Sequence, residues 1–107
     1  MAKHFNVTGS TAAAAQLTKE LLAAGDNIVF SNISLTNVHA DQWCKVDLYI
    51  EKKLTGKFYI AKNVTLPVGT TLIYDNVRID NTTSEFGLYI KLTQGASETP
   101  AVDVILY

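Results

Sequence analysis

The sequence predicts an all-β protein, an antiparallel β-sandwich of about seven or eight strands with a jelly-roll or immunoglobulin-like arrangement. Two observations lead to this prediction. Segments such as VDLYIE (residues 46–51) and GLYIKL (87–92) alternate apolar with polar residues and are rich in Val, Ile, Tyr and Phe, which is typical of half-buried strands. Short turn sequences separate these segments, among them KKLTGK (52–57) and QGASETP (94–100). The 107 residues fit a single domain, residues 1–107.

The start of the chain leaves two alternatives. We expect residues 1–10 to form an extended or mobile N-terminal arm. The next segment, STAAAAQLTKELLAAG (10–25), has the composition of a helix, with a Ser or Thr cap at its start and Gly25 just past its end. A repeated template favours a strand over residues 16–22 instead. Helix and strand both stay open for this segment.

That template occurs twice, as LAAGDNIVFSNISLTN (22–37) and LPVGTTLIYDNVRIDN (66–81). In the second copy Pro67 forbids a regular helix through the turn, and a strand pattern precedes it. If the copies are alike, Leu22 also ends a strand, and the chain contains a possible internal pseudo-repeat. No helix pattern and no GK[ST] motif follow Gly69, so this glycine predicts a turn and not a phosphate loop. The matched pairs are Leu22 with Leu66, Gly25 with Gly69, Asn32 with Asn76, and Asn37 with Asn81.

The remaining strands follow from alternation. Residues 58–66, FYIAKNVTL, place Phe58, Ile60, Val64 and Leu66 on one face, which Lys62 interrupts. Residues 102–107 behave like 46–51 and 87–92, and Gly56 can take a positive φ in the hairpin over 52–57. The residues expected to face the core are Val29, Ile33, Leu35, Val46, Leu48, Ile50, Ile73, Val77 and Ile79.

Composition excludes several classes of function. The net charge is −1 and the basic residues are scattered, with Arg78 the one arginine, which argues against a nucleic-acid surface. A single cysteine, Cys44, excludes an internal disulfide framework and a multi-cysteine zinc site. The start MAKHFNVTGS has no apolar signal region and no run approaches 18 apolar residues, so we expect synthesis in a cytoplasm and no membrane partner.

No group of residues predicts catalysis, a cofactor or a metal. His39 and Asp41 are two potential ligands where a catalytic zinc needs three, and no nucleophile-elbow turn frames Ser31 or Ser34. Cys44, between Trp43 and an apolar strand, is expected to be a small buried hydrophobe. The segment DNTTSE (80–85) offers oxygens from Asp80, Asn81 and Glu85 but lacks the spacing of an EF-hand loop, so an Asx-type turn is expected there.

The aromatic residues are the more informative feature. Alternation places a set of rings on strand faces that point away from the predicted core. Tyrosine suits interfaces because its ring buries well and its hydroxyl tolerates water. We therefore expect an interface between subunits that contains Phe30, Tyr49, Tyr59, Tyr74, Tyr89 and Tyr107.

A family resemblance rests on five strings: NISLTN (32–37), VDLYI (46–50), FYIAKNVTLPVGTTLIYD (58–75), LYIKL (88–92) and VDVILY (102–107). They resemble a family of small virion proteins of tailed bacteriophages, whose pattern runs I-x-L-x-N, V-D-L-Y, Y-Y-I-x-K-N-V-x-I-P-x-G-x-T-L and V-D-V-I-L. The match covers residues 28–107, and the alanine run within 10–25 departs from it. The resemblance implies a structural part of the particle, such as a head decoration, neck or tail-attached component, and it carries no active site.

These observations lead to one expected function and one alternative. The expected function is that of a non-enzymatic, multi-copy virion protein, a homo-oligomer whose partners are its own copies and other virion proteins such as the major capsid or the tail and neck proteins. The alternative is a receptor- or carbohydrate-binding domain of a tail fibre or spike, with Trp43 as a stacking platform.

Overall fold

The computed structural model describes residues 3–8, 16–26, 28–40, 42–52, 56–75, 78–80, 86–93 and 100–107. Within these ranges the chain forms ten strands and no helix. The predicted all-β sandwich is confirmed.

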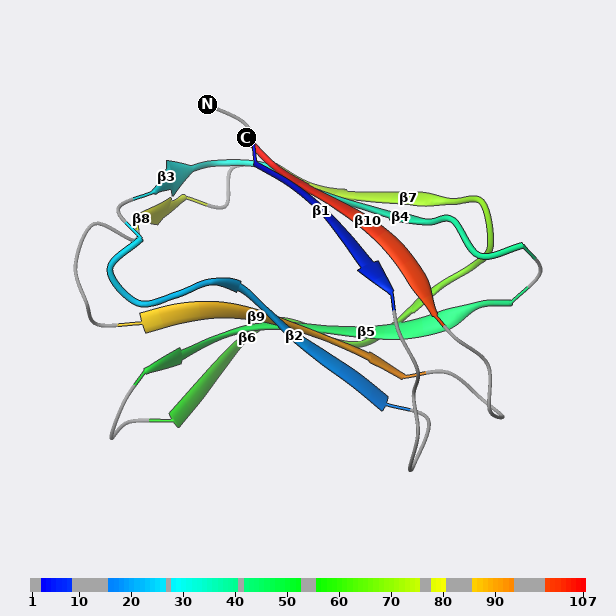
Figure 1. The fold of residues 1–107 in the computed structure, drawn as a ribbon, viewed down its shortest axis with the longest axis horizontal. Coiled ribbons are helices and arrows are strands. Elements are labelled where there is room, and N and C mark those ends of the chain that lie inside the picture. The colour runs from blue at the N-terminus through cyan, green and yellow to red at the C-terminus, as the bar shows by residue number, and fades with distance from the viewer. Residues whose placement is uncertain are drawn as a thin grey trace.

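The strands form two four-stranded antiparallel sheets (Figure 1). Sheet A, the upper layer, has the order β1 (Lys3–Thr8), β10 (Ala101–Leu106), β4 (Ile33–Asn37), β7 (Thr71–Tyr74). Sheet B, the lower layer, has the order β2 (Gln16–Leu22), β9 (Phe86–Thr93), β5 (Cys44–Lys52), β6 (Gly56–Leu66). Two short strands, β3 (Val29–Phe30) and β8 (Ile79–Asp80), pair at one end. The chain repeatedly crosses between the sheets in the order of a jelly roll, which decides between the two predicted arrangements.

The core lies between the sheets and follows from the period-two pattern of each strand. Side chains of both inner faces interdigitate there, and burying each one contributes about 1.5–3 kcal/mol relative to exposure. The most completely buried side chains are Val7, Leu22, Ile33, Leu35, Val46, Leu48, Leu88, Ile90, Leu92, Val102, Val104 and Leu106.

Of the segment that was left open between helix and strand, the described part forms a strand, because β2 pairs with β9 over Gln16–Leu22. The turns after β2 and β6 are alike, as the repeated template predicts. Gly25 has a φ of 88° and Gly69 a φ of 72°, a region that glycine adopts without strain. A backbone hydrogen bond closes each turn, from Asp26 to Ala23 at 3.1 Å and from Thr70 to Pro67 at 3.3 Å. Four template positions, residues 27, 76, 77 and 81, lie outside the described residues.

For two strands, the prediction of which side chains point toward the core is wrong. In β7, Leu72 and Tyr74 pair with the buried Leu35 and Ile33, so Tyr74 packs against the core while Ile73 is 56% exposed. In β3, Phe30 is buried and Val29 is exposed, again the reverse of the prediction. Both segments carry apolar residues on two successive positions. Alternation alone therefore does not decide which face turns inward, and pairing with a neighbouring strand does.

A bulge changes which side chains of β6 point toward the core. Asn63 has a φ of 53°, and its N–H donates to the Asp47 carboxylate at 2.7 Å. The register shifts on both sides of Leu48, so Ala61 takes the core position opposite it. Phe58 and Leu66, which alternation placed on one face, therefore differ in burial, and Phe58 is 47% exposed while Leu66 is buried.

The expected N-terminal arm is part of sheet A. Residues 3–8 form β1, which pairs with β10 in six consecutive residue pairs and is the edge strand of that sheet. Gly56, at the start of β6, has the positive φ predicted for the hairpin, 111°.

Candidate interaction surface

Three tyrosines form a row across the outer face of sheet B. Tyr89 of β9 lies opposite Tyr49 of β5, and Tyr49 lies opposite Tyr59 of β6. Glu20 of β2 lies opposite Tyr89, so the row crosses all four strands. We call these four residues the tyrosine row. Neighbours in register on adjacent strands are the pairs that stabilise a sheet.

The rings of the tyrosine row contact one another. Tyr49 and Tyr89 are stacked, with centroids 5.6 Å apart and planes 12° apart. Tyr49 and Tyr59 are tilted by 53°, with centroids 5.4 Å apart. Both separations lie in the favourable range for aromatic pairs, which contribute about 0.5–1.5 kcal/mol each beyond burial. The row is therefore a preorganised feature of the surface.

Charged groups surround the row. The Lys57 ammonium lies 4.9 Å from the Tyr49 centroid and the Lys62 ammonium 4.3 Å from the Tyr59 centroid, which are cation–π distances. The Tyr89 hydroxyl donates to the Glu20 carboxylate at 2.8 Å. This hydrogen bond raises the pKa of Tyr89, with burial adding to the effect. Burial raises the pKa of Tyr49, and the charge of Lys57 opposes that shift.

The row is not a uniformly open apolar patch. Tyr49, at 4% exposure, is covered on the outer face of the sheet, while Tyr59 is 43% exposed. The Tyr49 ring stacks against Tyr89 and lies near the Lys57 ammonium, so this buried ring offers no open face to a sugar. The surface instead offers ring edges, hydroxyl groups and charges, which is a composition suited to a protein partner.

The structure separates the other residues of the predicted interface. Phe30 and Tyr74 lie on the core side and cannot make an outer contact, which corrects the prediction for these two. Tyr107 is exposed but follows β10 of sheet A, where its carbonyl accepts hydrogen bonds from the backbone N–H groups of Ser31 and Asn32. It is therefore not part of the tyrosine row.

A second surface feature lies at the end of the sandwich where β4 and β6 terminate. Val38, Trp43 and Val68 are each more than two-fifths exposed there. Their loops are joined through Asn37, whose backbone N–H donates to Thr70 at 3.1 Å. We call Val38, Trp43 and Val68 the apolar tip.

Asn37 is a buried polar residue that organises this end and that sequence reasoning missed. It is 1% exposed, and its side-chain amide donates to the carbonyls of Gln42 at 3.0 Å and Leu66 at 2.9 Å. Its side-chain oxygen accepts the His39 N–H at 3.0 Å. The signal for it was the asparagine at the end of each template copy, Asn37 and Asn81.

The residues considered for chemistry have structural surroundings. The His39 ring nitrogen Nδ1 accepts the Gln42 N–H at 3.1 Å, and Asp41 lies outside the described residues. Cys44 is 1% exposed, and burial raises its pKa to about 11, as expected of an unreactive buried thiol. Ser34 lies on β4 of sheet A, opposite Ile73 and Ile105.

The described ranges contain neither a metal-binding cluster nor a membrane-spanning helix. No three His, Cys, Asp or Glu side chains there are grouped as a metal ion would require. No helix in that part of the chain is long and apolar enough to cross a membrane. Of the calcium-site residues considered above, Asn81 and Glu85 lie outside these ranges.

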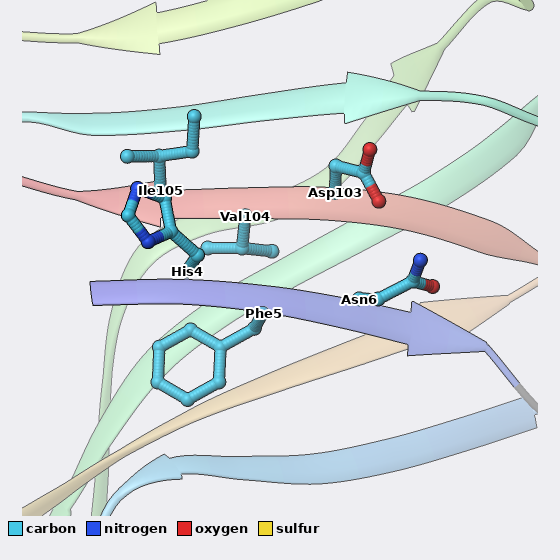
Figure 2. A pocket seen from close by; sticks show the side chains of 6 residues that line it. All are labelled: His4, Phe5, Asn6, Asp103, Val104 and Ile105. Atoms are coloured by element: carbon cyan, nitrogen blue, oxygen red, sulfur yellow. The ribbon is translucent and has the colours of Figure 1, made fainter. Parts of the chain in front are cut away.

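A hollow of about 350 Å³ lies along β1 and β10 (Figure 2). His4 and Asn6 project from β1 on the same side as Asp103 and Ile105 of β10, whereas Phe5 projects to the opposite side. The hollow therefore lies over the pairing of β1 with β10, because its lining residues are opposite one another on these two strands.

Comparison with known proteins supports the fold. No protein-family model matches the sequence, and no curated protein does. A mitogen derived from Yersinia pseudotuberculosis is similar in structure, with a TM-score of 0.64 and 15% identity over 99% of this chain and 86% of that chain. PirA is similar with a TM-score of 0.58 and 11% identity over 99% and 93%. A Bacillus endospore appendage protein is similar with a TM-score of 0.53 and 15% identity over 100% and 86%. At these identities the likeness shows the shared fold.

Proposed function

We propose that the protein is a non-enzymatic structural subunit that assembles in several copies on an extracellular particle, as a bacteriophage virion component. The observation that carries the proposal is the tyrosine row, a rigid aromatic feature on the outer face of a sheet. The sequence resemblance to small phage virion proteins supports the same reading. The similar endospore appendage protein belongs to a family of disulfide-linked pili, so this fold occurs in assembled structures.

Contacts between copies of this chain would be non-covalent. Its one cysteine, Cys44, is buried and unavailable for a disulfide between subunits. Tyr59 is the most exposed ring of the tyrosine row and would supply the central contact. Burying roughly 100 Å² of its apolar surface would contribute about 2 kcal/mol before the ordering cost, and symmetry repeats that contribution.

Sedimentation velocity tests this contact. The wild-type protein should sediment as an oligomer at micromolar concentration, and Tyr59→Ala should weaken the association by about tenfold or more while the monomer stays folded. Ile73→Ala is the matched control, because Ile73 is a comparably exposed apolar side chain on the outer face of sheet A. A Tyr59→Ala oligomer as stable as the wild type would exclude the tyrosine row as the contact.

The virion assignment has its own experiment. Quantitative mass spectrometry of purified phage particles from the source of this sequence should find the protein in a fixed ratio to the major capsid protein. Its absence from particles that contain all other structural proteins would refute the assignment, whatever the oligomeric state.

A second candidate function is glycan binding by a tail fibre or spike domain. The observation that favours it is Trp43, which is 44% exposed on a loop held in place by the hydrogen bonds of Asn37. A glycan array should then show binding by the wild type that Trp43→Ala abolishes and Tyr59→Ala retains. No binding on a broad array would leave the subunit function as the better explanation.

A further inference from the structure

Three of the four edge strands carry features that oppose pairing with another strand. In β2, Lys19 lies opposite the buried Ile90, so a charge occupies a core-side position at the edge, and the register shifts at Leu22. β6 is bulged at Asn63, and β7 is only four residues long. Inward charges, bulges and short strands are the usual protection of a sheet edge.

β1 has no bulge and is longer than β7, and its one core-side charge, Lys3, lies at the first residue of the strand, opposite the buried Leu106. It pairs with β10 over six consecutive residues without a register shift, and it ends the strand order of sheet A. Within the described residues, no strand covers its other side. A regular edge strand of this length presents backbone N–H and C=O groups in the geometry that another strand requires.

We propose that β1 pairs antiparallel with β1 of a second copy, which joins the two A sheets into one continuous sheet. The proposal deepens the proposed function by naming one contact between copies, and it uses a sheet edge where the tyrosine row uses a sheet face.

The residue pattern of β1 indicates that the strand pairing with it belongs to a second copy of this chain. Phe5 and Val7 point toward the core, and His4, Asn6 and Thr8 point outward. A twofold axis perpendicular to the sheet places the core-side faces of both copies on the same side of the joined sheet. This condition allows a register centred on Phe5, with His4 opposite Asn6, or one centred on Asn6, with Phe5 opposite Val7. Neither register places like charges opposite each other, so β1 is complementary to itself.

Charge substitution on the outward side chains tests the proposal. We would prepare His4→Lys/Asn6→Lys and His4→Asp/Asn6→Asp, both at exposed positions, and circular dichroism would first verify the fold of the acidic variant, because residue 6 also lies opposite Asp103 of β10. In either register each variant alone opposes like charges, and its dimer should weaken by about tenfold in sedimentation velocity. An equimolar mixture opposes unlike charges, and native mass spectrometry should show restored dimers of one copy of each variant.

A control variant and a hydrogen-exchange measurement on the wild-type protein complete this test. Thr71→Lys/Ile73→Lys places the same charges on β7, the other edge of sheet A, and should leave the dimer unchanged. In the wild type, amide hydrogen exchange in residues 3–8 should slow as protein concentration rises through the dimerisation range. Exchange in β1 that does not depend on concentration would overturn the proposal even if both variants misfolded.

The outcomes separate this proposal from the contact of the tyrosine row. If Tyr59→Ala dissociates the protein and the β1 variants do not, the β1 pairing is wrong and the tyrosine contact stands. If the β1 variants dissociate it and pair in the mixture while Tyr59→Ala has no effect, the β1 pairing stands alone. A wild type that is monomeric at all concentrations overturns the β1 pairing, and particle composition still decides the virion assignment.

Discussion

Replacing Asn37 with alanine should cost more stability than any surface change on this protein. Its side chain makes three hydrogen bonds, two donated to Gln42 and Leu66 and one accepted from His39. A typical bond of this kind contributes about 1 kcal/mol net, and a buried polar group left without a partner costs about 1–3 kcal/mol. The expected loss is therefore about 3 kcal/mol.

Equilibrium urea unfolding measures this loss. A loss of about 3 kcal/mol should lower the midpoint by roughly 2 M at a slope of about 1.5 kcal/mol/M, and the melting temperature by about 10–20 °C. Thr65→Ala is the control, because Thr65 is exposed on β6 and its removal should change stability by less than about 0.5 kcal/mol. The reasoning fails if Asn37→Ala loses less than about 1 kcal/mol, since water would then replace the side chain without penalty.

Three further measurements probe other parts of the structure. Asp47→Ala should cost about 1–2 kcal/mol in urea unfolding, because the Asn63 N–H loses its partner in the β6 bulge, and Asp47→Asn should recover at least half of that loss. The buried Cys44 thiol should resist a thiol reagent at pH 8 in the native state, and labelling within seconds would contradict its burial. The free energy of unfolding should also fall as the pH rises from about 9 toward 11, because the thiol ionises at a lower pH in the unfolded state than in the native state. Tyr89→Phe should reduce the loss of stability above about pH 10. The raised pKa of Tyr89 means that its hydroxyl ionises at a higher pH in the native state than in the unfolded state. If the stability of both proteins falls equally with pH, the result would count against the Glu20 hydrogen bond.

The sequence by itself determined the class of fold and most of the strands. Period-two alternation located β5, β6, β9 and β10, while the repeated template only favoured a strand over Gln16–Leu22, and the pairing of β2 with β9 decided it against the helical composition. The glycines of the template also predicted the turns, because the positive φ at Gly25 and Gly69 suits a residue without Cβ. These are local properties, set by a residue and its neighbours in the chain.

Which residues meet on the surface was decided only by the tertiary structure. Alternation put Tyr49, Tyr59 and Tyr89 on outward faces, but their alignment in one row depends on the register between three strands, including the bulge at Asn63. The predicted facing of Tyr74 was wrong because its segment is apolar on both faces, and pairing with Ile33 turned it inward. Register and facing are set by contacts between residues far apart in the chain, and a period-two pattern contains no information about its partner strand.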